Sequence, residues 1–106
     1  MNLESHKSFD QRCYELLLQI PKGKVTTYRE IAHELRINAY RAVGQAMNRN
    51  PNLVEVPCYR VVKSNGEVGG YAGGLSRKIE LLRQEGVDVS ESGRIDLSKF
   101  LYSFSD

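Results

Sequence analysis

The sequence predicts a small α/β domain that is mainly helical, with a helix-turn-helix and a short β-hairpin. The chain has 106 residues, of which 41% are hydrophobic, so one modest core is expected. The first half carries helix-capping signals followed by apolar residues at helical spacing. The second half holds a short apolar run and an Asn-Gly turn signal. A single domain over residues 1–106 is therefore predicted, with its core at about 8–88 and a tail at 89–106.

The first predicted helix runs from about Phe9 to Ile20. Ser8 has the position of an N-cap, and Gln11 three residues later completes a capping box. Cys13 and other apolar residues recur on one face at helical spacing, which indicates packing against a core. The Pro-Lys-Gly-Lys segment that follows Ile20 ends the helix.

Two shorter helices follow in the sequence. Thr27 as N-cap and Glu30 at the third helical position form a second capping box. Asn38 is expected to cap a third helix, which runs from about Ala39 to Asn48. Two short helices with a tight turn between them are typical of a helix-turn-helix, and a hairpin after them makes the domain winged-helix-like.

An extended apolar run and a hairpin come next. The run covers residues 54–62, and Asn65-Gly66 suits a type I′ turn between strands at about 60–63 and 67–69.

A glycine-rich loop, a fourth helix and a tail complete the chain. The loop at 69–74 leads to a helix that is capped by Ser76 and ends at Glu85. Gly86 has the position of the left-handed residue that follows a helix. The tail after it either docks on the core or frays, and the sequence leaves both open.

The net charge of +2 is unevenly distributed along the chain. Residues 22–83 hold eleven Lys or Arg and five acidic residues, whereas the two ends together hold four and eight. A basic centre between acidic ends suggests a polyanion partner for the centre. A solvated surface without any partner explains the same pattern equally well.

Several classes of protein are not expected. No apolar run approaches the roughly 18 residues of a membrane helix, and the N-terminus lacks the apolar core of a signal peptide, so a cytoplasmic protein without membrane contact is predicted. Cys13 and Cys58 do not form a disulfide framework. His6 and His33 lie far from any Cys-x-x-Cys motif, so no metal site is predicted.

Cys58 is the candidate nucleophile. Pro57 restricts the backbone just before it, and the nearby Arg60 is a cation of the kind that lowers the pKa of a thiol. The alternative is an inert buried cysteine, because cysteine is among the most buried residue types. The residue types by themselves favour this alternative.

Several motifs, in order, resemble those of the O6-alkylguanine-DNA alkyltransferases. Val-Pro-Cys-Tyr-Arg-Val-Val at 56–62 resembles their acceptor motif Pro-Cys-His-Arg-Val-Val. Residues 21–28 resemble the approach to their helix-turn-helix, 41–47 their recognition helix, 69–75 their pocket loop and 81–86 their closing helix. The resemblance covers the family's C-terminal DNA-binding and active-site domain, without a counterpart of its N-terminal α/β domain.

The resemblance implies that a monomer binds double-stranded DNA containing O6-alkylguanine through the minor groove. Arg41 would fill the space left by the flipped base, and Tyr28 would crowd its phosphate. Ala42 and Gly44 would let the helix enter the narrow groove, and Arg60 is expected to contact DNA as well. Residue type alone also allows a surface phosphate contact for Arg41 and a core-packed aromatic for Tyr28.

The resemblance also implies an irreversible, cofactor-free reaction. The thiolate of Cys58 would accept the alkyl group once, with the hinge residue Asn50 and the acid Glu85 supporting the site. Tyr59 stands where the family has the histidine that activates the thiol. Because tyrosine has a pKa near 10 against about 6.5 for histidine, it is a poor base. We expect the reaction to be slower by about 10²–10⁴-fold rather than absent.

The resemblance implies a pocket for the flipped base. Tyr71 would hold the guanine, with Ala72, Gly73, Val56 and Pro57 around it. A flipped base needs an apolar wall and polar groups along its edge. Ala72 stands where the family commonly has a serine, so one hydrogen bond to O6 is expected to be missing.

Two other functions stay open. The chain also resembles alkyltransferase-like proteins, which bind the same lesions and recruit excision-repair proteins without transferring anything. Its length and Tyr59 favour this alternative, whereas retention of Cys58 opposes it. A helix-turn-helix binding module without a lesion pocket is the third alternative, and it leaves the Pro-Cys-Tyr-Arg and Gly-Gly-Tyr segments unexplained.

Overall fold

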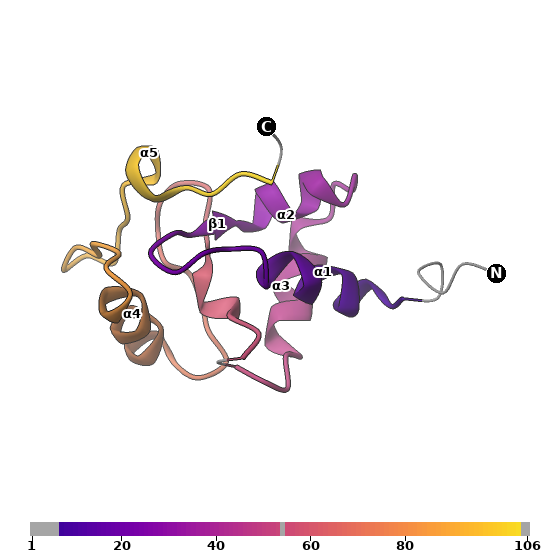
Figure 1. Ribbon diagram of the computed structural model, residues 1–106, viewed down its shortest axis with the longest axis horizontal. Coiled ribbons are helices and arrows are strands. Elements are labelled where there is room, and N and C mark those ends of the chain that lie inside the picture. Colours follow the sequence, from indigo (N-terminus) through magenta and orange to yellow (C-terminus); the bar gives the residue numbers. More distant parts are fainter. Residues whose placement is uncertain (1–6, 54, 105–106) are drawn as a thin grey trace.

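The computed structural model describes residues 7–53 and 55–104 (Figure 1). The start of the extended run at Val54, and both ends of the chain, lie outside the described residues. The elements in chain order are α1 (Phe9–Leu17), β1 (Thr26–Thr27), α2 (Tyr28–Glu34), α3 (Tyr40–Asn48), the 3₁₀ turn η2 (Cys58–Arg60), β2 (Val61–Val62), α4 (Leu75–Gln84) and α5 (Leu97–Phe100).

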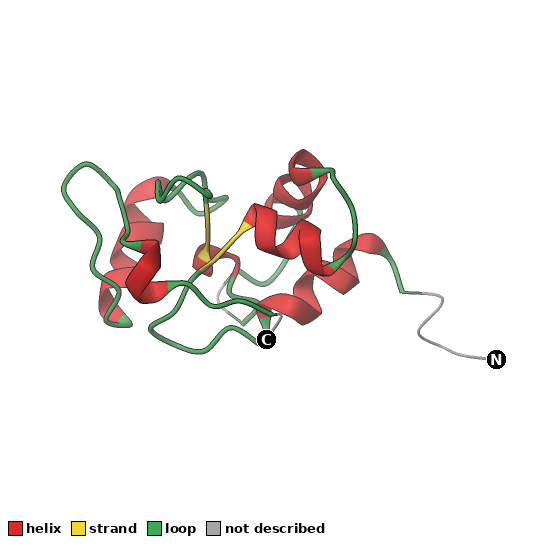
Figure 2. Ribbon diagram, turned by 90° about the horizontal axis from the view of Figure 1, so that it is seen from above, coloured by secondary structure: helices red, strands yellow, loops and turns green. Residues whose placement is uncertain are grey.

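The molecule is mainly helical, with one small sheet, as the sequence predicts. The helices α1, α2 and α3 form one group and α4 with α5 a second group, with the two strands between them (Figure 2). No helix in the described part of the chain is long and apolar enough to cross a membrane.

The N-caps of the first two helices are confirmed, and at the first helix the capping box is complete. Ser8 accepts a hydrogen bond from the backbone of Gln11 at 3.1 Å, and the Gln11 side chain accepts one from the backbone of Ser8 at 2.9 Å. Thr27 accepts from the backbone of Glu30 at 3.0 Å. Helix α1 ends at Leu17, three residues earlier than predicted, and the chain leaves it through two tight turns.

The turn of the helix-turn-helix begins where α2 ends, at a residue with a left-handed backbone conformation. Arg36 has φ +60°, and the backbone N–H groups of Arg36 and Ile37 donate to the carbonyls of His33 and Ala32 at 3.0 and 2.9 Å. This pair of bonds is the Schellman motif, which usually has glycine at the left-handed position. Asn38 does not cap α3, because the N-cap is Ala39 and it makes no side-chain cap bond.

The predicted strand at 60–63 pairs differently from the prediction. Residues 61–62 lie parallel to 26–27, with Thr26 opposite Val61 and Thr27 opposite Val62. All four side chains are buried, as is usual for parallel strands that are covered on both faces. The turn signal at Asn65-Gly66 concerns neighbouring residues only, so it could not predict this long-range pairing.

The predicted hairpin is therefore reduced to a tight loop. The N–H of Gly66 donates to the carbonyl of Lys63 at 3.0 Å, and the N–H of Lys63 donates to the carbonyl of Glu67 at 2.8 Å. Gly66 is left-handed, with φ +93°, whereas Asn65 is not. This is a three-residue loop with a glycine bulge rather than a type I′ turn. Glu67 then forms an isolated antiparallel bridge with Arg94.

The tail docks on the core. Leu101 forms a parallel bridge with Val25, and the Thr26 hydroxyl donates to the Tyr102 carbonyl at 3.0 Å. Phe100 is buried.

Helix α4 starts at Leu75 rather than after a Ser76 cap. Gly86 occupies the predicted left-handed position with φ +93°.

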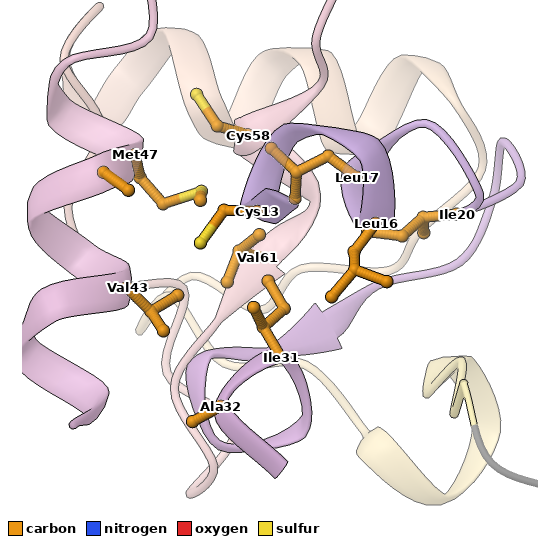
Figure 3. Close-up of a cluster of buried hydrophobic side chains, with 11 residues drawn as sticks. Cys13, Leu16, Leu17, Ile20, Ile31, Ala32, Val43, Met47, Cys58 and Val61 are labelled. Carbon is orange, nitrogen blue, oxygen red and sulfur yellow. The ribbon is translucent and has the colours of Figure 1, made fainter. Parts of the chain in front are cut away.

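The core consists of two clusters of buried side chains that meet at η2. One cluster lies beneath α1, α2 and α3 and includes Cys13, Met47 and Cys58 (Figure 3). The other lies between α4, the strands and the tail and includes Tyr59. Successive residues of η2 therefore face different clusters. In Figure 3 the sulfur of Cys58 lies at the edge of its cluster.

Candidate active site

A pocket of about 360 Å³ lies between α2, α3, η2 and the glycine-rich loop. This volume is within the range of small-molecule binding sites. The predicted site residues on its wall are Tyr28, Arg41, Gly44, Cys58, Tyr71 and Ala72. Residues as far apart in sequence as Tyr28 and Ala72 thus meet at one cavity.

Cys58 reaches the pocket because the backbone before it is tied down. The side-chain amide of Asn50 donates to the carbonyl of Val56 at 2.7 Å, and its oxygen accepts from the backbone of Asn52 at 2.9 Å. The N–H of Cys58 also donates to the Val56 carbonyl at 2.7 Å. Asn50 therefore links the end of α3 to the cysteine segment. Val56 and Pro57, which were predicted to border the pocket, shape this segment and are not on the pocket wall.

Cys58 is buried, with 4% of its surface exposed. Burial raises its pKa above the ordinary value, while a hydrogen bond from Asn50 and the charge of Lys78 offset part of that effect. A buried thiol with a raised pKa holds little thiolate at neutral pH, so its nucleophilicity depends on these two neighbours.

Tyr59 points away from the pocket into an internal cluster with Arg60 and Glu85. Its hydroxyl donates to Glu85 at 2.6 Å. Burial and this hydrogen bond raise the pKa of Tyr59 to about 12. Tyr59 is therefore no base at neutral pH.

Arg60 belongs to the same internal cluster. Its guanidinium donates to Glu85 twice, at 2.9 and 2.7 Å, and to the Ile20 carbonyl at 2.7 Å. The side chains of Arg60 and Glu85 are only 12% and 8% exposed. The guanidinium is thus turned to an internal carboxylate, and the DNA contact of Arg60 stays a prediction from the sequence.

Removing the carboxylate of Glu85 should destabilise the fold strongly. Glu85→Ala leaves Arg60 buried without its counter-charge, and we expect the free energy of unfolding to fall by about 3–5 kcal/mol. Urea unfolding at pH 7 measures this loss. Glu80→Gln on the exposed face of α4 is the matched control, because Glu80 pairs with Arg77 while 56% exposed, and exposed pairs contribute about 0–1 kcal/mol.

The same pair makes stability depend on pH. Burial acts to raise the pKa of Glu85, but hydrogen bonds from Arg60 and Tyr59 outweigh it and leave that pKa below the ordinary value of 4.5. The stabilisation by Glu85 is therefore present above pH 4.5 and is lost as the pH falls through the lowered pKa. The stability gap between wild type and Glu85→Gln should narrow below pH 4.5. Equal unfolding midpoints at pH 7 for wild type and Glu85→Ala would contradict this account.

Tyr71 contacts its own loop and two other segments of the chain. Its hydroxyl donates to the Leu53 carbonyl at 3.3 Å, and its ring meets the Tyr59 ring edge-on, with centroids 6.3 Å apart. A Cβ at Gly73 would lie 2.7 Å from the Tyr71 ring, so a larger residue there would push the ring aside. Gly73 thus lies against Tyr71 and is not on the pocket wall.

Gly73→Ala should displace Tyr71 without unfolding the protein, because Gly73 is exposed. We expect binding to O6-methylguanine DNA to weaken by about tenfold, which is the scale of one lost base–aromatic stack. Ser76→Ala is the control, because Ser76 is exposed on α4 and is not on the pocket wall. Titration of a labelled lesion duplex gives both dissociation constants. An unchanged dissociation constant for Gly73→Ala would show that Tyr71 does not bind the flipped base.

The recognition helix α3 contributes one rim of the pocket. Arg41 is exposed at the start of α3, and a Cβ at Gly44 would face open space. Ala42 is half-buried and is not on the pocket wall. Tyr28 reaches the pocket from α2, with its hydroxyl 3.4 Å from the position of a Cβ on Gly69.

Several residues at the site were missed by the sequence reasoning. Gln45, Met47, Asn48 and Gly70 also line the pocket. Helical periodicity could have indicated Gln45 and Asn48, because 41, 44, 45 and 48 share one face of the recognition helix. Lys78, described below, was also missed, although it lies three and four residues before the apolar Leu81 and Leu82 on the buried side of α4.

The chain is similar to a known family and to known proteins over most of its length. The family model for 6-O-methylguanine DNA methyltransferase, DNA binding domain, matches residues 8–87. The bifunctional methyltransferase/endonuclease of Picrophilus torridus is 43% identical over 94 residues, which are 88% of this chain and 31% of that protein. The methylated-DNA--protein-cysteine methyltransferase of Mycobacterium leprae is 47% identical over 78 residues, 73% of this chain and 47% of that protein. The chain therefore spans less than half the length of these two relatives.

Two solved structures are similar over most of the chain. Mycobacterium tuberculosis OGT in complex with DNA has a TM-score of 0.72 at 44% identity, covering 74% of this chain and 50% of that one. S. pombe Atl1 in complex with damaged DNA containing O6-carboxymethylguanine has a TM-score of 0.80 at 30% identity, covering 97% and 99%. The match to residues 8–87, supported by this shared fold, shows that the chain belongs to the family of the 6-O-methylguanine DNA methyltransferase DNA-binding domain.

Proposed function

We propose that this protein repairs DNA by flipping an O6-alkylguanine from the duplex and transferring its alkyl group to Cys58. The observation that carries the proposal is the single pocket that is lined by Cys58, by Tyr28 and Tyr71, and by the recognition-helix residue Arg41. A reactive thiol beside two aromatic rings suits a flipped base, which is held by stacking and by polar contacts along its edge.

The helix that would contact the duplex also borders the pocket. Arg41, Gln45 and Asn48 are exposed on α3 and all line the cavity. The small Gly44 between them lets the helix approach the floor of a narrow minor groove. A base that leaves the stack beside Arg41 would therefore enter the pocket directly. The basic centre of the chain would make binding depend on salt.

The reaction is a direct displacement. The sulfur of Cys58 forms a bond to the alkyl carbon as the bond from that carbon to O6 breaks, and the electron pair of the broken bond stays on the guanine. The thiol loses its proton and the restored guanine gains one at N1, so the overall change needs no cofactor. The thioether is not readily reversed, so each molecule acts once.

A second candidate function is lesion recognition without transfer, with excision-repair proteins as the downstream partners. The raised pKa of the Cys58 thiol favours it, as does the commitment of Tyr59 to Glu85. The fold similarity to Atl1 over nearly the whole of both chains also favours it. We place it second because Cys58 itself lies on the pocket wall.

The two functions are separated by one incubation. The protein is mixed with a duplex that carries a single O6-methylguanine, and intact mass and peptide maps are recorded over time. A gain of one methyl group on Cys58 establishes the transferase. No gain, with binding that prefers the lesion duplex over undamaged DNA, establishes the non-catalytic function. Equal binding to both duplexes rejects both.

A further inference from the structure

Lys78 is a lysine in the interior of the protein. Its side chain on α4 is 0% exposed. The Nζ atom donates to the carbonyl of Val61 at 2.7 Å and to the carbonyl of Gly70 at 2.9 Å. An ammonium group has three N–H donors, and these carbonyls take two of them. Burying a charged group at this depth costs free energy unless the group is hydrogen-bonded and paired with an opposite charge.

The ammonium lies directly behind the wall of the active-site pocket. Gly70, whose carbonyl it binds, lines the pocket together with Cys58, and Val61 follows Cys58 by three residues. The charge of Lys78 lowers the pKa of the Cys58 thiol, and a thiolate at Cys58 in turn favours the charged form of Lys78. The interaction is thus mutual.

The other groups around Cys58 do not supply a comparable charge. Tyr14 on α1, Tyr28 on α2 and Tyr71 in the glycine-rich loop all have pKa values raised by burial, so they are neutral at physiological pH. Asn50 is a neutral hydrogen-bond partner. Arg41 borders the pocket from α3 but is exposed, where water and salt screen its charge.

The Tyr59 cluster on the far side of η2 is also neutral overall. Its cation, Arg60, is paired with the carboxylate of Glu85 at 2.7 Å. Tyr59 keeps its proton on the same carboxylate. Neither Tyr59 nor Arg60 is therefore available to draw the proton from the Cys58 thiol.

We propose that Lys78 is the charge partner of Cys58, and that its buried ammonium stabilises the attacking thiolate where no general base is at hand. The inference rests on the proposed function, in which Cys58 is the alkyl acceptor. Lys78 acts through Cys58 and does not touch the alkyl group, so it is a positioning residue. It keeps its protons during the displacement, and the proton of the thiol passes to solvent before the sulfur attacks.

The partnership predicts a distinctive pH profile. Burial lowers the pKa of Lys78 to about 7, so the pair loses its first proton near neutrality. Because the two groups are coupled, the pair that has lost one proton exists in two forms. In one form a thiol faces a neutral amine, and in the other a thiolate faces an ammonium group. Some thiolate is then present well below the pH at which an isolated buried thiol ionises.

The test measures the thiol without DNA. The full chain is treated with iodoacetamide between pH 5.5 and 10, and peptide mapping separates Cys58 from Cys13. Iodoacetamide forms a carbon–sulfur bond to the thiolate and releases iodide. The fully buried Cys13, whose pKa is raised to about 11 by burial, is the internal control and should stay unmodified below pH 9.

Two variants separate charge from hydrogen bonding. Lys78→Gln keeps N–H donors for the two carbonyls but removes the charge, and Lys78→Arg keeps the charge. In wild type we expect the Cys58 rate to rise near neutral pH. In Lys78→Gln the rise should move up by at least about one pH unit, with a rate at pH 7.5 about tenfold lower. Lys78→Arg should restore most of the wild-type rate.

A Lys78→Gln profile that superimposes on the wild type would overturn the proposal. If Lys78→Gln does not fold, the wild-type profile decides: a single rise above pH 9 overturns the partnership, and a rise near neutrality supports it. Failure of the proposed function looks different, because Cys58 would then show the neutral rise with iodoacetamide yet gain no methyl group from lesion DNA.

Discussion

Cys58→Ser should abolish alkyl transfer while leaving lesion-selective binding within about threefold of wild type. The hydroxyl of serine is a far weaker nucleophile than a thiolate at neutral pH, whereas the pocket wall changes by a single atom. A threefold change in affinity is only about 0.65 kcal/mol. Intact mass after incubation with an O6-methylguanine duplex reports transfer, and titration of the same duplex reports binding.

The matched control for this substitution is Cys13→Ala. Cys13 is a buried member of the core cluster under α1 and is not on the pocket wall, so this variant should still gain one methyl group. Methylation of Cys58→Ser at the wild-type rate would show that another residue accepts the alkyl group. Loss of both transfer and binding would show that Cys58 also maintains the pocket.

Tyr59→His should accelerate transfer by about 10²-fold at pH 7.5. A histidine has a pKa near 6.5, and general-base assistance typically contributes about 10²–10⁴-fold. Glu85 lies 2.6 Å from the hydroxyl of Tyr59, so a carboxylate is already in place to orient an imidazole. Single-turnover transfer rates for wild type and variant, each with excess protein, measure the gain.

The control for Tyr59→His is Tyr59→Phe. It removes only the hydroxyl, and Glu85 keeps its two bonds from Arg60. Because Tyr59 is not a base, the transfer rate of Tyr59→Phe should match that of the wild type. A large loss of rate in Tyr59→Phe would instead mean that the hydroxyl takes part in the reaction. No gain in Tyr59→His would mean that the imidazole does not reach the thiol.

Local features of the fold were predictable because they depend on neighbours in sequence. The caps at Ser8 and Thr27 and the helix end at Gly86 were predicted and are confirmed. Each involves groups only a few residues apart. The pairing of Val61 with Thr26 was not predicted, because long-range partners are chosen by the packing of whole elements.

Part of the candidate site was predictable in the same sense. The motifs named Cys58, Tyr28, Arg41 and Tyr71, and the structure brings all four to one pocket. The sequence could not show that Gly73 lies against the Tyr71 ring. That contact depends on the path of the loop in space rather than on the residue type.

The sequence by itself determined the family motifs, the order of the helices and the presence of a cysteine after a proline. Only the tertiary structure decided what surrounds that cysteine. Tyr59 and Arg60 turn inward to Glu85, and Lys78 is buried behind the pocket. The physical reason is that burial and partner distance set the charge of each group, and both arise from elements far apart in the chain.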